Sequence, residues 1–179
     1  MVLLVIDAQK LITTEKLYMY KTFIYNVKTL IETARNSSIE VIFVRHDDGE
    51  NQPLSKENEG FEIYDKFSPL SNEKIYDKFV NSPFKESGLL DYLKSKNEHT
   101  LIITGLQTDY CIDAAVKCGF EHGFEILIPE YSNSTFDNNF MTAEESYNYY
   151  NKFIWNGRYG KYISFTDMIN MMKNPLNES

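Results

Sequence analysis

The chain has 179 residues, 42% of them hydrophobic and 15% aromatic, which is enough for a sizeable core. Its net charge of −8 argues against a nucleic-acid partner, because such binding rests on contacts between basic side chains and phosphates. The sequence has neither an apolar stretch long enough for a bilayer nor the pattern of a signal peptide. We therefore expect one domain over residues 1–179 and no membrane partner.

Short apolar runs alternate with segments of helical periodicity along the chain. The apolar runs predict strands over residues 2–6, 39–44, 74–76, 100–103, 124–128 and 162–163. The periodic segments predict helices over residues 22–36, 89–93, 109–121, 142–153 and 166–172, with a capping box at the start of the fourth. Apolar strands that alternate with amphipathic helices are typical of a parallel sheet covered on both faces.

Three reactive side chains lie at the ends of predicted strands. Asp7 follows the first strand, Lys78 the third and Cys111 the fourth. In open α/β sheets this edge is where ligands bind. A carboxylate, a cation and a thiol form a nucleophilic set, in which the carboxylate takes the thiol proton and the lysine stabilises the thiolate.

Cys111 stands in the first turn of a predicted helix, after a predicted turn at Gly105. Unpaired backbone N–H groups and the helix dipole favour a thiolate there, so we expect a lowered pKa for this thiol. Cys118 lies two turns further along the helix, too far for a disulfide, and is expected to be a packing residue. Two unpaired thiols suit a reducing cytoplasm.

The individual residues have less specific interpretations as well. Asp7 could cap a turn after the first strand. The tetrapeptide Tyr-Asp-Lys-Phe occurs twice, so Lys66 has the same local context as Lys78, and only the downstream residues 82–84 favour Lys78. His46 fits a pocket residue and a plain strand-end histidine equally well.

Four segments in order resemble the isochorismatase-like cysteine hydrolases, a family that includes nicotinamidases and ureidoacid hydrolases. They are LVIDAQ at residues 4–9, VIFVRH at 41–46, KFVNSPF at 78–84 and ITGLQTDYC at 103–111. The resemblance covers roughly residues 2–155. It implies a three-layer α/β/α Rossmann-like fold with a parallel six-stranded sheet of order 3-2-1-4-5-6.

The resemblance also implies roles for single residues. Asp7 matches the general base, Lys78 the catalytic lysine and Cys111 the nucleophile. The family often has a non-proline cis peptide before the cysteine, which here would be Leu106–Gln107. The backbone N–H groups of Gln107 and Cys111 would then form the oxyanion hole.

The implied activity is hydrolysis of a small amide or ureido C–N bond through a thioester, without a cofactor. One alternative is hydrolysis of a vinyl ether such as isochorismate, but several members with that activity do not need the cysteine. Another alternative is a thiol-sensing or binding protein on the same scaffold. The presence of Asp7 and Lys78 favours the enzyme, because a sensor needs no general base.

Metal and substrate contacts follow from the same comparison. Nicotinamidases bind a metal with histidines after the second strand, where this chain has only His46, so we predict no metal. The side chains predicted to line the substrate pocket, all close to the site in sequence, are Gln9, His46, Phe84, Leu106 and Tyr110.

An aromatic stripe near the carboxyl end bears on assembly. Residues 147–155 contain three tyrosines, a phenylalanine and a tryptophan, a composition that fits either core packing or a subunit interface. Because relatives are commonly dimers or larger, we predict a homo-oligomer, either a dimer or a tetramer.

Overall fold

The computed structural model describes residues 1–174, and a parallel sheet of seven strands forms its centre. The strands are β1 (Val2–Ile6), β2 (Glu40–His46), β3 (Lys74–Lys78), β4 (Thr100–Leu106), β5 (Glu125–Pro129), β6 (Asn133–Ser134) and β7 (Lys161–Ile163). Their order is β3-β2-β1-β4-β5-β7, and the short β6 also pairs with β4. The predicted class and order are confirmed, with β7 as the predicted sixth strand. The two polar residues of β6 gave no apolar signal in the sequence.

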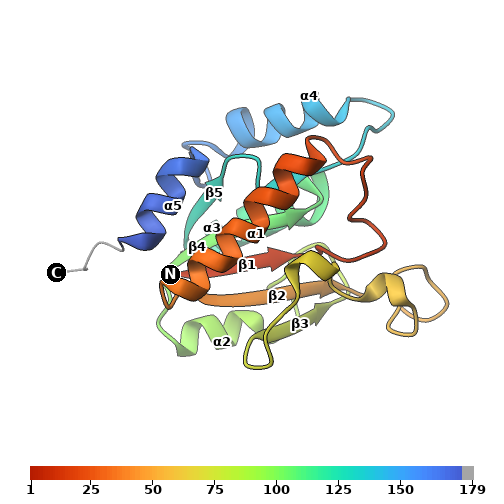
Figure 1. The fold of residues 1–179 in the computed structure, drawn as a ribbon, viewed down its shortest axis with the longest axis horizontal. Helices are drawn as coiled ribbons and strands as arrows, with labels where there is room; N and C mark the ends of the chain where they lie inside the picture. The colour runs from red at the N-terminus through yellow and green to blue at the C-terminus, as the bar shows by residue number, and fades with distance from the viewer. Residues whose placement is uncertain (175–179) are drawn as a thin grey trace.

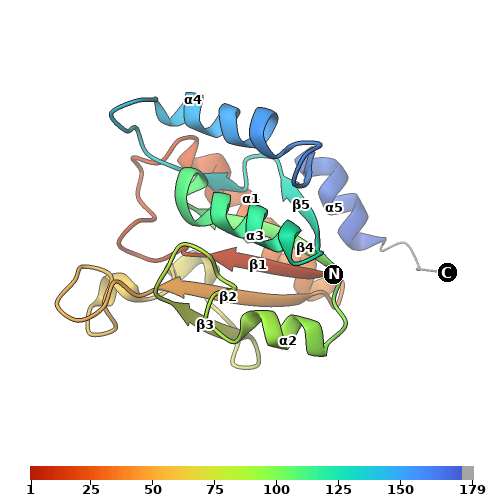
Figure 2. The ribbon, with the colours of Figure 1, turned by 180° about the vertical axis from the view of Figure 1, so that it is seen from behind.

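Helices cover both faces of the sheet, which makes three layers (Figures 1 and 2). One face carries α1 (Tyr20–Asn36) and α5 (Phe165–Lys173), and the other carries α2 (Leu89–Ser95) and α3 (Asp113–Glu121). The remaining helices are α4 (Ala143–Asn148), the 3-10 helices η1 (Glu59–Phe61) and η2 (Asp65–Phe67), and the π-helices η3 (Thr108–Ile112) and η4 (Tyr149–Trp155). In the described part of the chain, no helix has the length and apolar character needed to cross a membrane.

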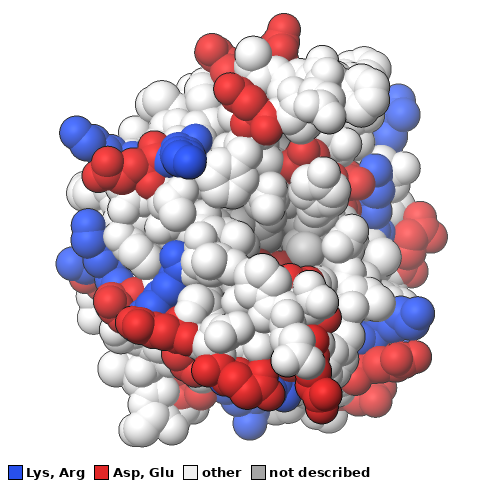
Figure 3. Space-filling model, turned by 90° about the vertical axis from the view of Figure 1, so that its right-hand side faces the viewer, with Lys and Arg blue, Asp and Glu red and all other residues white. Residues whose placement is uncertain are grey.

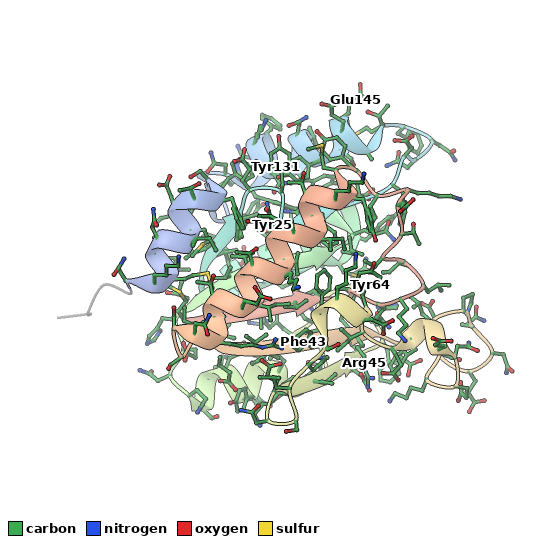
Figure 4. All side chains as sticks on the ribbon, viewed as in Figure 1. Tyr25, Phe43, Arg45, Tyr64, Tyr131 and Glu145 are labelled. Carbon is green, nitrogen blue, oxygen red and sulfur yellow. The ribbon has the colours of Figure 1, made fainter. Side chains whose placement is uncertain are left out.

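The apolar runs of the sequence are buried because the sheet is packed on both sides. On β1, Leu3 and Val5 join the core under α1, while Leu4 and Ile6 join the core under α2 and α3. Side chains of a strand alternate between faces, so a strand between two helix layers has to be apolar throughout. Phe43 of β2 is buried on the α1 side, whereas Tyr25 on α1 is 65% exposed (Figure 4).

Two predicted helices contain π-helical turns. The segment predicted as one helix over 109–121 begins with η3 and continues as α3, and the segment from 142 begins with α4 and ends with η4. The hydrogen-bond pattern of a π-turn leaves no mark in hydrophobic periodicity, so the sequence did not indicate it. The capping box between Thr142 and Glu145 is confirmed.

The aromatic stripe at residues 147–155 divides between core and surface. Tyr147 and Trp155 are fully buried, whereas Tyr149 is 40% and Phe153 is 64% exposed. Tyr150 is partly buried and packs on Trp155, so core packing accounts for these three residues and not for Tyr149 and Phe153. The homo-oligomer expected from this stripe stays a prediction.

The strands β2, β3 and β4 extend two or three residues beyond their predicted ends. The predicted turn at Gly105 is therefore wrong. β4 continues through Gly105 to Leu106, and Gly105 pairs with Ile6 of β1 and Asn133 of β6. Gly105 has a φ of +127°, and a Cβ added to it would lie 1.9 Å from the Ile6 carbonyl oxygen. Only glycine permits this approach of β4 to β1.

We expect Gly105→Ala to lower the free energy of unfolding by at least about 3 kcal/mol, because the strands must separate to admit a methyl group. Gly123→Ala is the matched control: its φ is also positive, +89°, but nothing lies within 4 Å of an added Cβ. The control should lose only about 1 kcal/mol. Equal losses for the two variants in denaturant titrations would show that the contact with Ile6 does not matter.

Candidate active site

Asp7, Lys78 and Cys111 meet at the carboxyl edge of the sheet. Lys78 Nζ lies 2.8 Å from Asp7 Oδ2 and 3.2 Å from Cys111 Sγ. The exposed fractions of Asp7, Lys78 and Cys111 are 2%, 0% and 8%. Figure 3 views this edge, and the surface is hollowed near its middle. The competing Lys66 lies in η2 and is exposed, so the structure brings Lys78 and not Lys66 to this place.

The sheet register explains how a residue of β3 reaches one of β1. Lys78 pairs with His46 at the end of β2, which lies between the two strands. Asp7 follows the last paired residue of β1, has a positive φ of 50° and donates its backbone N–H to the Val44 carbonyl at 2.8 Å. The long lysine stem spans the end of β2 and brings its ammonium to the carboxylate.

His46 contacts the ammonium from the β2 side, and Gln9 fixes the backbone of His46. Lys78 Nζ lies 2.8 Å from His46 Nδ1, and His46 Nε2 lies 3.0 Å from Asp48 Oδ1. Because an ammonium can only donate, Nδ1 accepts and Nε2 carries the hydrogen that faces Asp48. Gln9 accepts the His46 backbone N–H and donates to the carbonyls of His46 and Phe61, at 2.9 to 3.0 Å.

These contacts decide between the interpretations of two predicted residues. Gln9 is fully buried and its amide is paired with backbone groups, so it positions β2 and leaves the predicted substrate contact without support. His46 is not a plain strand-end histidine, because its ring contacts the ammonium of Lys78. Asp48, its partner, was missed because nothing in the loop sequence distinguishes it from the acids around it.

The oxygen, nitrogen and sulfur of Asp7, His46 and Cys111 lie within 4.8 Å of one another and could in principle ligate a metal ion. In this structure all three surround the Lys78 ammonium, which donates to each of them. A metal ion on the same donors would have to displace that ammonium. The absence of a catalytic metal stays a prediction, and this arrangement supports it.

Burial is the main cause of the raised pKa values of Cys111 and Asp7. It raises the pKa of Cys111 to about 12, and the neighbouring Asp7 carboxylate adds to the effect while Lys78 opposes it. Burial also raises the pKa of Asp7, against the lowering effect of the Lys78 ammonium. The lowered thiol pKa expected from the helix start is therefore wrong. The low exposure and the nearby carboxylate, neither visible in the sequence, outweigh the helix terminus.

Asp7 can therefore accept a proton, and Cys111 has one to give. One Asp7 oxygen accepts from Lys78, while Asp7 Oδ1 is buried and has no hydrogen-bond partner among the described residues. The Cys111 thiol carries its proton at neutral pH and has the side-chain oxygen of Asn81 at 3.7 Å. Asn81 was missed as a single residue, although it lies within the motif at 78–84.

The backbone before Cys111 has the predicted form. The Leu106–Gln107 peptide bond is cis, as the resemblance implied. The Gln107 carbonyl accepts the N–H groups of Tyr110 and Ile112, both at 3.1 Å. Within residues 1–174, the Gln107 N–H donates no backbone hydrogen bond.

Two further predicted pocket residues belong to the core. Leu106 is fully buried in the core on the α1 side. Phe84 is 5% exposed and packs on the rings of His122 and Phe124, near Gly119 of α3. Proximity in sequence does not fix the direction in which a side chain points, and the contact of these two residues with a substrate stays a prediction.

Tyr110 is a predicted pocket residue that does line an open space. It is 53% exposed and lines a hollow of about 430 Å³, together with residues of the segment 138–150. Sequence reasoning missed this segment, although a run of polar residues with Phe140 and Met141 before a helix cap is a signal for a functional loop.

A parallel sheet of this order, with a buried thiol, carboxylate and ammonium at its carboxyl edge, defines an α/β protein with a site equipped for nucleophilic chemistry. The family model for the isochorismatase domain matches residues 1–144. The chain therefore belongs to the isochorismatase family.

Relatives agree with this assignment. An uncharacterized isochorismatase family protein of Bacillus subtilis (strain 168) is 30% identical over 112 residues, which are 62% of this chain and 60% of that protein. The streptothricin hydrolase of Streptomyces noursei is 21% identical over 108 residues, 60% of this chain and 39% of that protein. A crystal structure of an isochorismatase family protein superimposes with a TM-score of 0.84, at 27% identity, over 91% of this chain and 97% of that one. The matches to the curated relatives thus span less than two thirds of their lengths.

We expect Asp7→Asn to lower the pKa of Cys111, because the neighbouring carboxylate is one cause of its rise, and Lys78→Met to raise it further, because the ammonium opposes that rise. The pH dependence of alkylation by iodoacetamide, measured at each cysteine by mass spectrometry, tests both directions. Cys118 is the internal reference. An Asp7→Asn protein whose Cys111 titrates at the same or a higher pH would contradict this electrostatic description.

Proposed function

We propose that this protein is a cysteine hydrolase of a small amide or ureido C–N bond, with Cys111 as nucleophile, Asp7 as general base and Lys78 as the charge that holds them. The observation that carries the proposal is one ammonium in contact with both groups, at 2.8 Å and 3.2 Å, beside an unpartnered oxygen of the base. A buried carboxylate oxygen without a donor is costly unless the site uses it.

The first half of the reaction forms a thioester. The Cys111 proton passes to Asp7 Oδ1 as Sγ attacks the carbonyl carbon, so a free thiolate need not accumulate and the raised thiol pKa is no obstacle. The backbone N–H groups of Gln107 and Cys111 would stabilise the oxyanion. Asp7 then passes the proton to the leaving nitrogen, the C–N bond breaks, and ammonia or an amine departs.

The second half returns the enzyme to its starting state. Asp7, ionised again, takes a proton from a water molecule that attacks the thioester carbon. The C–S bond breaks, the acid product leaves, and the proton returns to Cys111. Lys78 keeps the pocket close to electrical neutrality throughout, because one negative charge is present at each stage: on Asp7 while Cys111 is protonated or acylated, and on the oxyanion while Asp7 holds the proton. The net reaction consumes one water molecule, and no step calls on a cofactor.

The burial of Cys111 favours this proposal over the thiol sensor. Redox-sensing cysteines are exposed and have a lowered pKa, whereas Cys111 is 8% exposed and its pKa is raised. The name of the Streptomyces noursei relative, a hydrolase, supports the reaction class. The two cysteines form no disulfide within the described residues, in keeping with the cytoplasmic location that we also propose.

We expect Cys111→Ala, Asp7→Asn and Lys78→Met each to lower kcat/KM by at least about 10³-fold, because the three groups act as one unit. A panel of small primary amides and ureido acids, assayed for release of ammonia, identifies a substrate. Mass spectrometry of the rapidly quenched wild-type reaction should then find the acyl group on the Cys111 peptide.

Cys118→Ala and Lys66→Met are the matched controls and should keep wild-type activity, since Cys118 lies two turns along α3 and Lys66 is exposed on η2. Hydrolysis that survives in the Cys111→Ala protein would overturn the proposed mechanism.

A further inference from the structure

A hollow lined by one carboxylate and three aromatic rings includes in its wall the two residues that precede the nucleophile in η3. Its volume is about 430 Å³, in the range of small-molecule sites. Its wall is formed by Asp109, Tyr110, Asn138, Asn139, Phe140, Met141, Ser146 and Tyr150. Asp109 and Tyr110 are the two residues before Cys111 in η3, so the element that carries the nucleophile also forms part of this wall.

Ser146 gives the hollow an unsatisfied polar group. The residue is 1% exposed, and its hydroxyl oxygen is buried without a hydrogen-bond partner among the residues that the structure describes. A buried hydroxyl without a partner costs about 1–3 kcal/mol, so a ligand that hydrogen-bonds to it would recover that loss. The Ser146 hydroxyl therefore indicates that the hollow receives a polar ligand.

The charge of the hollow indicates which polar ligand it receives. The Asp109 carboxylate accepts from the Thr135 hydroxyl at 2.5 Å and from Asn138 Nδ2 at 3.2 Å, which fixes its position and leaves further lone pairs for a donor. The lining contains no lysine, arginine or histidine. The negative charge of Asp109 therefore has no cationic side chain in the wall to compensate it.

The aromatic side chains favour a cation as well. The rings of Tyr110, Phe140 and Tyr150 contribute to the wall, and Phe140 is 96% exposed, so a ring face is open to a ligand. An ammonium group is attracted both to a carboxylate and to the faces of aromatic rings. An anionic ligand would meet only the Asp109 carboxylate and uncharged side chains.

We infer that this hollow binds an alkylammonium group, and that the substrates of the hydrolase carry such a group near the scissile amide. The inference about substrates rests on the proposed function, whereas binding in the hollow does not need Cys111. Asp109 would provide the charge, Ser146 a hydrogen-bond acceptor, and Tyr110, Phe140 and Tyr150 the ring faces.

The test is a titration of the full chain with propylammonium, and with propanol as a neutral molecule of the same length, followed by NMR of the backbone amides. Propylammonium should bind at least about tenfold more tightly than propanol and shift the amides of Asp109 and Ser146. Asp109→Asn should remove the preference. Ser146→Ala should weaken propylammonium several-fold without loss of stability, because its hydroxyl has no partner to lose.

Glu121→Gln, which removes the same charge from an exposed position at the end of α3, is the matched control and should bind as the wild type does. Equal affinity for propylammonium and propanol in the wild-type protein, or a preference that persists in Asp109→Asn, would overturn the inference. Either result would leave hydrolysis through Cys111 standing. Conversely, a cation site in a protein without Cys111-dependent hydrolysis would refute the proposed function and the inference about its substrates, and would leave binding of the alkylammonium group standing.

Discussion

The buried contact between Lys78 and Asp7 is the interaction on which the carboxyl edge of the sheet depends. It joins the ends of β3 and β1 across β2, and neither side chain is more than 2% exposed. An ammonium has three N–H donors, and the three acceptors around Nζ, on Asp7, His46 and Cys111, match that number. A buried ion pair needs such hydrogen bonding, because the two charges have lost their contacts with water. Removal of one partner leaves an uncompensated buried charge and costs about 3–5 kcal/mol.

The chemistry proposed for the site follows from how this contact distributes charge. The pocket holds one cation and two acids whose ionised forms are both disfavoured by burial. A single proton can then move between Cys111 and the unpartnered oxygen of Asp7 while the net charge stays balanced. The hollow lined by Tyr110 differs, because the charge of Asp109 has no cation in the wall to compensate it. The site around Lys78 is thus charge-balanced, whereas the hollow is negatively charged.

Local signals in the sequence were enough for a parallel sheet covered on both faces and for the positions of Asp7 and Cys111, because the carboxyl ends of parallel strands gather at one edge. The order of the strands came from the family resemblance. Lys78 needed the motif that follows it, since Lys66 has the same neighbours. Side-chain direction could not be read in the same way, and Phe84 and Leu106 proved to be core residues. The thiol pKa was predicted in the wrong direction for a related reason. Burial and a partner distant in sequence decide it, whereas periodicity reports only local structure.

The measurement that tests the buried contact most directly is a double-mutant cycle on the free energy of unfolding, with Asp7→Asn, Lys78→Met and the two combined. If the pair organises this edge, each single change leaves an uncompensated buried group, and the double variant loses less than the sum by at least about 2 kcal/mol. Losses that add within about 0.5 kcal/mol would show that the two residues do not depend on each other. That result would contradict the central role of the ion pair.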